Sequence, residues 1–402
     1  MRNKAISKVM LILSPSILLR ALGTDIFLPC LPSVAETFNV SFASAQWVLS
    51  VYLISSGLGQ FFMGPLADKF GRRKVLLANI ILFCLSSITA AIAPSLGILI
   101  FARFLQGFGA CGTTVATVAV VRDIFDDSTT PRAYSYFNSI IALAPLLAPI
   151  IGGILLVATG SWRATFYFVT AFSMLAFIVS YFAVTETNPR FLPEFQQVKL
   201  NVLKGYAEIL RSKIFASYVF CAIAGLTGLF LFFSMSSILL ITVLGVQADN
   251  FGYYFGLNSL IYLIGGVISP RVQAKFGLNK TILFGNYLIL LGALAMLIWD
   301  RLYGLSVVGL MLPNFILTLG VGILFGPCMA GAVGPFKHIA GMASASYGAL
   351  LYFTTGIIVT IVMQRDIIDT KPLAIAMLCL GSLAFVIIKR QFRFNLSLDP
   401  AR

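Results

Sequence analysis

Three charged residues, Arg20, Asp25 and Arg103, lie deep in apolar stretches of the sequence. The rest of the 28 basic and 14 acidic residues lie in or beside polar segments. A charge at the centre of a membrane costs at least ~2.5–3.5 kcal/mol, so such residues usually face a cavity and serve a function. These side chains are therefore candidates for a functional site. The alternative is a buried ion pair that only locks two helices together.

The spacing of these residues favours a contact between Asp25 and Arg103. Residues five apart on one helix are separated by about 140° around its axis, so Arg20 and Asp25 are poor partners for each other. Arg103 lies in another apolar stretch and is the better candidate. A carboxyl group in an apolar cavity beside a cation can exchange protons near neutral pH. We therefore expect Asp25 to be a proton site coupled to Arg103.

The composition indicates an integral membrane protein. Hydrophobic residues make up 59% of the 402 residues and charged residues 10%, against ~45–50% and ~25% in soluble domains. The single histidine, His338, and six scattered cysteines provide no metal cluster and no His-dependent catalytic arrangement. We expect no enzyme activity, no metal and no cofactor, with a proton gradient as the energy source.

Twelve stretches reach the ~20 residues that a helix needs to cross the hydrocarbon core. They lie near residues 9–34, 43–65, 74–93, 97–121, 133–158, 163–185, 214–243, 251–273, 279–299, 303–329, 340–364 and 372–388. The expected fold class is all-α integral membrane, with twelve transmembrane helices in two six-helix bundles.

The longest polar connection runs from Glu186 to Lys213 and divides the chain into two halves. We expect an N-terminal bundle at 1–187, a cytoplasmic linker at 188–212 and a C-terminal bundle at 213–402. Within the linker, residues 200–210 are typical of a short amphipathic helix at the membrane surface.

The basic residues set the orientation. With both termini in the cytoplasm, 22 of the 28 basic residues lie in cytoplasmic segments and four in outside loops, which is a strong positive-inside signal. The net charge of +14 is thus explained by topology, and no nucleic-acid partner is expected.

The two halves of the sequence resemble each other. Lys69-Phe70-Gly71, after the second span, recurs 206 residues later as Lys275-Phe276-Gly277, after the eighth. Duplicated halves are typical of secondary transporters, which bind their cargo near the midplane between the repeats.

Polar residues at helical spacing are candidates for a cavity or for substrate contacts. They are Arg20, Gln46, Ser50, Gln60, Gln106, Asn138, Asn258, Tyr262 and Asn314. Ordinary hydrogen bonding between helices is the alternative for each, and none identifies a substrate. Residues 107–112 spell GxGxxG, but inside an apolar span small residues predict close helix contact rather than dinucleotide binding. Gly322 and Gly326 predict another such contact.

The loop at 64–74 contains Gly64, Asp68, Gly71, Arg72 and Arg73. Asp68 is the only acid among four cations, and it can cap a helix or pair with an arginine in one conformation and release it in another. A plain positive-inside anchor is the alternative.

Several motifs resemble the major facilitator superfamily. Residues 64–74 are similar to its loop GxLaDrxGrkxxl, and residues 103–109 are similar to its fourth-span RxxQGxG motif. Residues 144–153 resemble its fifth-span antiporter motif. Residues 25–32 are similar to the DxYLPxLP opening of the Bcr/CflA branch, the bicyclomycin and chloramphenicol resistance type.

This resemblance is specific over residues 20–190, and it implies an exporter that alternates between inward-open and outward-open states. It assigns Asp25 and Arg103 to proton coupling and Asp68 with Arg72 to a cytoplasmic latch. It assigns a bend that seals the cavity to Pro145, Pro149, Gly152 and Gly153. In the second half, Ala274 stands at the place of Asp68, so the resemblance implies a weaker gate there.

Arg20 has no counterpart in the family pattern. With Arg103 against Asp25 it would give the cavity a net positive charge, which we hypothesise favours neutral, zwitterionic or anionic cargo over lipophilic cations. A side chain that extends to the membrane surface is the alternative.

Together these features predict a proton-coupled multidrug exporter, a drug/proton antiporter, in a bacterial inner membrane. Its partners would be a small-molecule substrate, protons and the bilayer, and the family resemblance implies a monomer. An exporter of an endogenous metabolite, such as a siderophore or amino-acid derivative, and an uptake symporter or facilitator remain alternatives.

Overall fold

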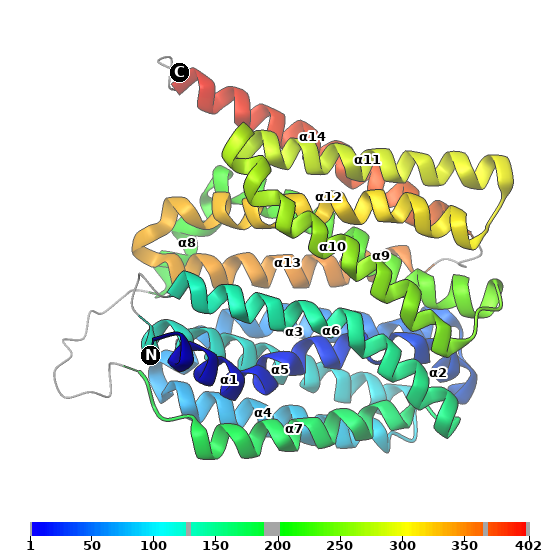
Figure 1. Cartoon of the computed structure of the whole chain (residues 1–402), viewed down its shortest axis with the longest axis horizontal. Coiled ribbons are helices and arrows are strands. Elements are labelled where there is room, and N and C mark those ends of the chain that lie inside the picture. Colours follow the sequence, from blue (N-terminus) through cyan, green and yellow to red (C-terminus); the bar gives the residue numbers. More distant parts are fainter. Residues whose placement is uncertain (1, 126–129, 189–201, 365–368, 399–402) are drawn as a thin grey trace. The chain divides into compact units, whose positions relative to one another are not determined.

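The computed structural model describes residues 2–125, 130–188, 202–364 and 369–398, and every element in this part of the chain is helical (Figure 1). The chain divides into two units. The first comprises Met1–Leu200 with Gln247–Tyr253, and the second comprises Asn201–Val246 with Tyr254–Arg402.

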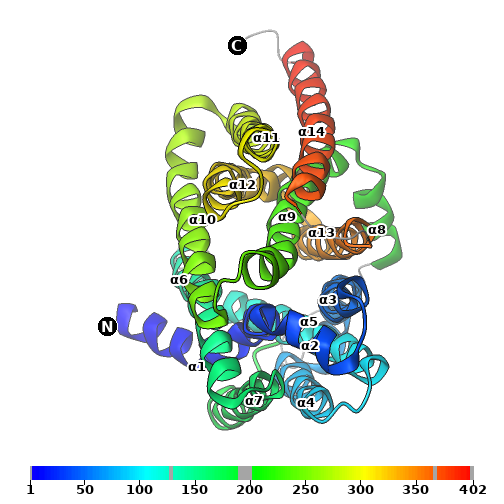
Figure 2. The ribbon, with the colours of Figure 1, turned by 90° about the vertical axis from the view of Figure 1, so that its right-hand side faces the viewer.

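The first unit holds six long helices and two short helical segments. They are α1 (Arg2–Asp25), η1 (Leu28–Cys30), α2 (Leu31–Phe38), α3 (Phe42–Phe70), α4 (Arg72–Ala91), α5 (Leu96–Ile124), α6 (Thr130–Thr159) and α7 (Arg163–Ala183). Viewed along the helices, α4 and α7 lie side by side, and α5 packs against α1, α3 and α4 (Figure 2).

The second unit repeats this plan after a short amphipathic helix. Its elements are α8 (Val202–Arg211), α9 (Lys213–Ser236), η3 (Ser237–Val243), α10 (Ala248–Phe276), α11 (Leu278–Tyr303), α12 (Val307–Val333), η4 (Gly334–Ile339), α13 (Ala340–Val362) and α14 (Lys371–Leu398). The helix predicted near 200–210 is therefore present as α8, whereas residues 189–201 of the linker lie outside the described part. The first residues of α10 belong to the first unit.

Eleven helical segments in the described residues are long and apolar enough to cross a membrane. In α6, which is 30 residues long, the apolar stretch Leu143–Thr159 lies within the part whose side chains are described. The all-helical membrane-spanning class predicted from the sequence is confirmed.

The first predicted span is interrupted directly after Asp25, and Pro29 explains the break. Proline has no N–H to give the carbonyl group four residues earlier, and its ring clashes with that carbonyl. For Pro29 that carbonyl belongs to Asp25, so α1 ends at Asp25 and the chain continues as η1 and α2. The candidate proton site therefore lies at a helix terminus inside the span.

Small residues allow the helices of the first unit to approach closely. A Cβ at Gly107 would overlap Ser55 Oγ and the carbonyl oxygen of Tyr52 on α3, and one at Gly109 would lie 3.0 Å from the Phe83 nitrogen on α4. The GxGxxG run is thus a packing surface, as predicted. In the second unit a Cβ at Gly322 would overlap the Tyr262 carbonyl on α10.

The close contact predicted at Gly326 is wrong. A Cβ there would meet no described atom within 4 Å. Gly322 and Gly326 are one turn apart on α12, so the close approach at Gly322 does not extend to the next turn.

We predict that Gly107→Ala destabilises the protein by about 3 kcal/mol, because the added methyl group meets backbone that cannot rotate away. Gly97→Ala is the matched control in the same helix, since its Cβ would meet no described atom within 4 Å. Thermal unfolding of both variants in detergent measures the difference. Equal melting temperatures for the two variants would contradict this packing.

Candidate functional site

Asp25 is buried inside the membrane-spanning part of the first unit. Only 5% of the residue is exposed, and it lies in the candidate span Val9–Phe38. The described residues give its carboxylate no hydrogen bond and no ion pair within 4.0 Å. The site therefore holds an acid at membrane depth without a direct cationic partner.

The predicted contact between Asp25 and Arg103 is wrong in this structure, because Arg103 binds backbone instead. Arg103 Nη1 donates to the carbonyl oxygen of Gly23 at 2.6 Å, and its Nε donates to that of Val48 at 3.0 Å. Gly23 lies in the last turn of α1, whose final carbonyl groups have no partner within the helix. Arg103 thus places a cation on the C-terminus of α1, the end that favours positive charge.

Aromatic rings enclose the Arg103 guanidinium. Its central carbon lies 4.3 Å from the ring centroid of Tyr52, 5.5 Å from that of Phe27 and 5.8 Å from that of Phe166. Arg103 is fully buried, so the ring faces replace part of the hydration that the cation loses. Of its nitrogens, Nη2 makes no hydrogen bond to any residue described in the structure.

A chain of hydrogen bonds connects Arg103 to α4. Its Nη1 donates to Gln106 Oε1 at 2.5 Å, Gln106 Nε2 donates to Ser87 Oγ at 2.7 Å, and that hydroxyl donates to the Phe83 carbonyl at 2.6 Å. The predicted cavity residue Gln106 is therefore a link between α5 and α4, and its amide orientation follows from these partners.

Arg20 lies one and a half turns before the end of α1. Its carbonyl oxygen accepts hydrogen bonds from Tyr52 at 2.8 Å and from Thr24 at 3.0 Å. Tyr52 thus connects the Arg20 backbone to the Arg103 guanidinium, and both predicted arginines belong to one neighbourhood.

The polar stripe on α3 is buried. Gln46, Ser50 and Gln60 are exposed by 1%, 0% and 8%. Ser50 Oγ and Gln60 Nε2 make no hydrogen bond within the described part of the chain. Burying such groups without partners is costly, so these positions are suited to contact water or cargo. The side chain of Asn138, another predicted candidate, lies outside the described residues.

In the second unit the predicted residues Asn258 and Asn314 meet. Asn258 Oδ1 accepts from Asn314 Nδ2 at 2.7 Å and from Thr318 at 2.9 Å, and all three side chains are buried. Tyr262, one turn after Asn258, is half-buried and makes none of these hydrogen bonds. The structure therefore brings together a polar group on α10 and α12, but not the whole predicted set.

The antiporter motif lies against the interrupted first span. A Cβ at Gly152 would overlap the carbonyl oxygen of Ile26 and lie 3.3 Å from Pro29 Cγ. Only glycine allows α6 to approach the residue after Asp25 this closely. The helix runs continuously through Pro145 and Pro149. Gly153 is also buried, and its Cβ would overlap the Ala248 carbonyl in the segment that belongs to the same unit.

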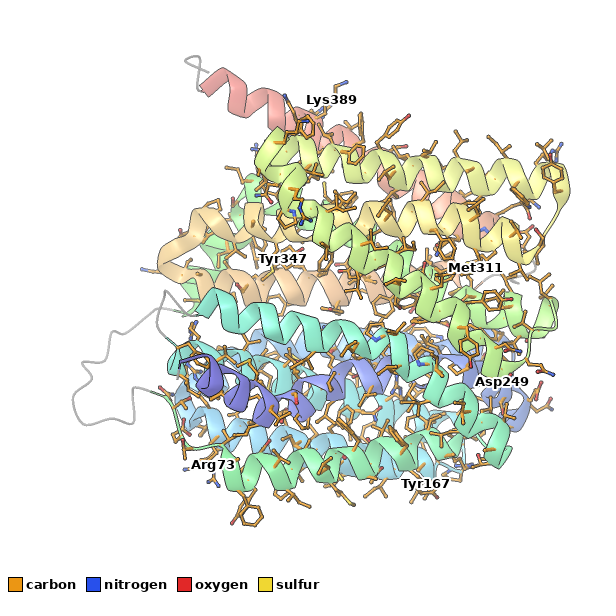
Figure 3. All side chains as sticks on the ribbon, in the orientation of Figure 1. Arg73, Tyr167, Asp249, Met311, Tyr347 and Lys389 are labelled. Atoms are coloured by element: carbon orange, nitrogen blue, oxygen red, sulfur yellow. The ribbon has the colours of Figure 1, made fainter. Side chains whose placement is uncertain are left out.

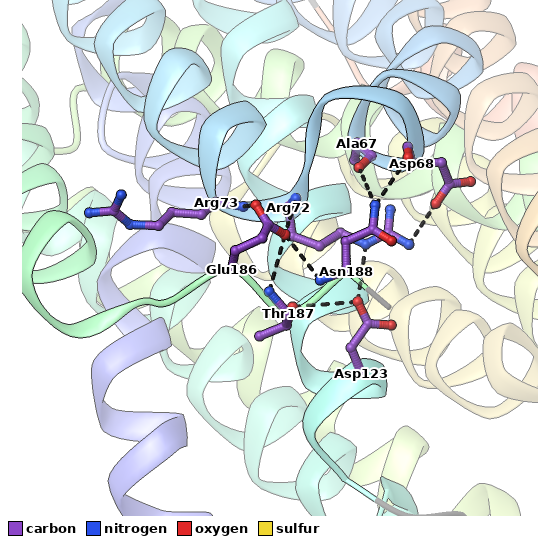
Figure 4. A network of polar contacts seen from close by, with 8 residues as sticks. All are labelled: Ala67, Asp68, Arg72, Arg73, Asp123, Glu186, Thr187 and Asn188. Carbon is purple, nitrogen blue, oxygen red and sulfur yellow. Dashed lines mark hydrogen bonds and ion pairs between the residues drawn. The ribbon is translucent and has the colours of Figure 1, made fainter. Parts of the chain in front are cut away.

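At the other end of the unit, the loop between α3 and α4 forms a network of ion pairs (Figure 4). Arg72 Nη2 lies 2.6 Å from Asp68 Oδ1, so the two residues of the predicted latch form an ion pair, and Arg72 Nε lies 3.1 Å from Asp123 Oδ2. The Asp68 side chain is 42% exposed, whereas those of Arg72 and Asp123 are 5% and 7% exposed. Gly64 has no described atom within 4 Å of its Cβ position.

Glu186 and Asn188 were not predicted as site residues, yet they hold this loop together. Glu186 Oε1 accepts from the backbone N–H of Arg72 at 2.8 Å, and Oε2 accepts from that of Arg73 at 3.2 Å. The carboxylate thereby caps the N-terminus of α4 from 114 residues away. Asn188 Nδ2 donates to the Asp68 carbonyl at 3.0 Å, at the end of α3. An acid and an amide directly after a span were the only sequence signals for this role.

Gly71 makes this cap possible. Its φ of +100° lies where residues with a Cβ are strained, and a Cβ would overlap Glu186 Oε2. Gly277 repeats the backbone conformation with a φ of +80°, but no described atom lies within 4 Å of its Cβ position. In the second unit, Asn279 at the start of α11 instead accepts a neutral hydrogen bond from Tyr218 of α9, 2.7 Å long.

Comparisons with known proteins agree with this architecture. The sequence profile of the family described as Major Facilitator Superfamily matches residues 13–388. The chain is 28% identical over 365 residues to a bicyclomycin resistance protein homolog of Haemophilus influenzae, covering 88% of each chain. It is 30% identical over 374 residues to multidrug resistance protein D of Escherichia coli, covering 91% of this chain and 92% of that protein.

Solved structures of the same fold include two kinds of transporter. A D-xylose–proton symporter superposes with a TM-score of 0.73 at 17% identity, covering 95% of this chain and 97% of that one. A POT family transporter in complex with a thioalcohol-conjugated peptide superposes with a TM-score of 0.76 at 15% identity. The superposition covers 99% of this chain and 97% of that one. At these identities the likeness concerns the fold alone.

We predict that Asp123→Ala destabilises the protein by at least about 3 kcal/mol, because it leaves the Arg72 cation buried with only its exposed partner. Asp68→Ala is the matched variant and should cost below about 1 kcal/mol, since the Asp68 carboxylate is half solvated. Thermal unfolding of the purified proteins compares the two. A larger loss for Asp68→Ala would show that burial does not decide the strength of these pairs.

Proposed function

Because the chain belongs to the major facilitator superfamily and is a membrane transporter rather than an enzyme, we propose that it is a proton-coupled exporter of small organic molecules. The names of its relatives support the direction of transport, since they include bicyclomycin, chloramphenicol and multidrug resistance proteins. These relatives are bacterial, so the proposed location is a bacterial cytoplasmic membrane, with the protein acting as a monomer.

The observation that carries this proposal is the buried carboxyl group of Asp25 at the end of α1. Ionisable residues at membrane depth commonly mark ion pathways and proton relays. In the first unit, Asp25 lies two residues after the Gly23 carbonyl that Arg103 binds. The proposed proton site is therefore close to a cation that is already engaged by backbone.

Protonation of Asp25 would act on the packing of the first unit. Asp25 is followed directly by Ile26, whose carbonyl oxygen lies against Gly152 of α6. The charged form would draw the remaining donor of Arg103, Nη2, towards the carboxylate, and the neutral form would release it. We propose that this change, made at the junction of α1 and α6, biases the exporter between its inward-open and outward-open states.

The cargo would compete with the proton for the same neighbourhood. Ser50 and Gln60 on α3 supply buried polar atoms for it. At the cytoplasmic end, the Asp68–Arg72 pair is proposed as the contact that forms in one state and breaks in the other, while Asp123 and Glu186 keep the loop in place.

We predict that Asp25→Asn abolishes transport against a gradient. In proteoliposomes with an imposed pH gradient, addition of cargo from a panel of antibiotics, amino acids and siderophore-like anions should change the internal pH for the wild type. The variant should respond no more than empty liposomes, because an amide cannot bind and release the proton. Glu36→Gln is the control, as Glu36 is an exposed acid of the same unit.

Each result of this experiment has a distinct meaning. A pH change that the Asp25 variant retains would place coupling elsewhere. A folded wild type that moves labelled cargo without any pH change would be a facilitator, and proton and cargo moving in the same direction would make it a symporter.

We predict that Arg20→Ala shifts the preference among charged cargoes towards lipophilic cations, because it removes one of the two cations that we propose give the cavity its net positive charge. An anionic and a cationic compound of similar size are made to compete in the same liposomes. The ratio of their transport rates measures the preference. An unchanged ratio would sink the idea that Arg20 sets cargo charge.

A further inference from the structure

An apolar groove runs between α4 and α7 on the surface of the first unit. It is lined by Ile81, Cys84, Leu85, Met174, Phe177 and Ile178. Ile81, Leu85, Met174 and Ile178 are exposed by 44% to 58%. In a protein that spans a membrane, side chains of this kind face lipid. The groove is therefore a place where a hydrocarbon chain can lie between two helices.

The depth of the groove matches one leaflet. Helix α4 begins at Arg72, at the end predicted to be cytoplasmic. At 1.5 Å per residue, Ile81 lies about 14 Å and Leu85 about 20 Å along the axis. Half of a ~30 Å hydrocarbon core is about 15 Å. A single acyl chain that starts at the cytoplasmic surface would thus reach the groove.

Basic and aromatic side chains of α4 and α7 lie at the cytoplasmic end of this groove. Lys74 is exposed and precedes Ile81 by seven residues, which places both on one face of α4. On α7, Tyr181 follows Met174 by seven residues and stacks on Phe177 with ring centroids 5.9 Å apart. Tyrosine rings at this level are typical of the membrane–water interface.

Arg73 connects the two helices at this point (Figure 3). Its Nε donates to the Val184 carbonyl and its Nη2 donates to the Tyr181 carbonyl, each at 2.7 Å. The guanidinium lies 5.3 Å from the Tyr181 ring centroid. Its third nitrogen, Nη1, makes no hydrogen bond to the residues that the structure describes, so it keeps donors for an outside oxygen atom.

We propose that an anionic phospholipid of the cytoplasmic leaflet binds here, with its phosphate at Lys74 and Arg73 and one acyl chain in the groove. The charges are complementary, because two cations stand at the headgroup level while the groove below is apolar. The Glu186 carboxylate at this end of the unit is engaged by the backbone N–H groups of Arg72 and Arg73. The lipid would thereby strengthen the connection between α4 and α7 beside the cap of the α3–α4 loop.

Photo-crosslinking tests this site in the full-length protein. The protein is reconstituted with phosphatidylglycerol that carries a diazirine near the middle of one acyl chain, or with phosphatidylcholine of identical chains. Adducts are mapped by mass spectrometry. We expect adducts at residues 81–85 and 174–178, and at least about fivefold more of them with phosphatidylglycerol, since each basic residue at the headgroup contributes ~1 kcal/mol to anionic-lipid binding.

Two variants separate the headgroup from the groove. Lys74→Glu should abolish the preference for phosphatidylglycerol. Lys280→Glu is its matched control, because Lys280 is the exposed third residue of α11 as Lys74 is of α4, and it should change nothing at these positions. Cys84→Trp should block the groove and remove adducts of both lipids there.

Equal labelling by both lipids, unaffected by Lys74→Glu, would mean ordinary lipid contact and would overturn the proposal. The proposal would also be overturned if a cargo compound displaced the adducts of both lipids equally, because the groove would then bind cargo. None of these readouts depends on transport activity.

Discussion

The first unit is organised around the capping of α1 by Arg103. Pro29 ends that helix at Asp25, which leaves carbonyl groups of its last turn inside the membrane without helical partners. Bilayer hydrocarbon supplies no water to satisfy them. Arg103 satisfies the Gly23 carbonyl and binds the Val48 carbonyl and Gln106 with its other donors. One side chain thereby fixes α1 against α3 and, through Ser87, α4 against α5.

The same contact explains why an acid and a base can lie so near each other without forming an ion pair. The donors of Arg103 are directed to backbone and amide oxygens, and three rings surround its charge. Asp25 then remains the side chain whose charge is not fixed by a described partner. Gly152 brings α6 against Ile26, the residue after Asp25, so a change at Asp25 acts on a tightly packed junction. Such packing changes between discrete arrangements rather than deforming gradually.

Much of this was readable from the sequence, and the failures have a common cause. Residue types and spacing predicted the helical membrane class, the buried Asp25 and Arg103 and the packing role of Gly107, and the family resemblance predicted the Asp68–Arg72 pair. The partner of Arg103 was predicted incorrectly because it is a backbone carbonyl, that of Gly23 in the last turn of a helix that Pro29 ends, and a backbone carbonyl carries no residue type of its own. Glu186 and Asn188 escaped notice for the same reason, as their partners are backbone groups more than 100 residues away. Gly277 shows the opposite case. Its sequence context and its positive φ repeat those of Gly71, but no described carboxylate lies beside it.

The central claim is that Asp25 binds the transported proton while Arg103 stays on the end of α1. Infrared difference spectroscopy of the protein in lipid, recorded as the pH is lowered, tests it most directly. The account predicts that the wild type develops the carbonyl stretch of a protonated carboxyl group, and that Asp25→Asn lacks this band while keeping its folded state. The same band with equal intensity in both proteins would contradict the account, because the titrating carboxyl group would then lie elsewhere.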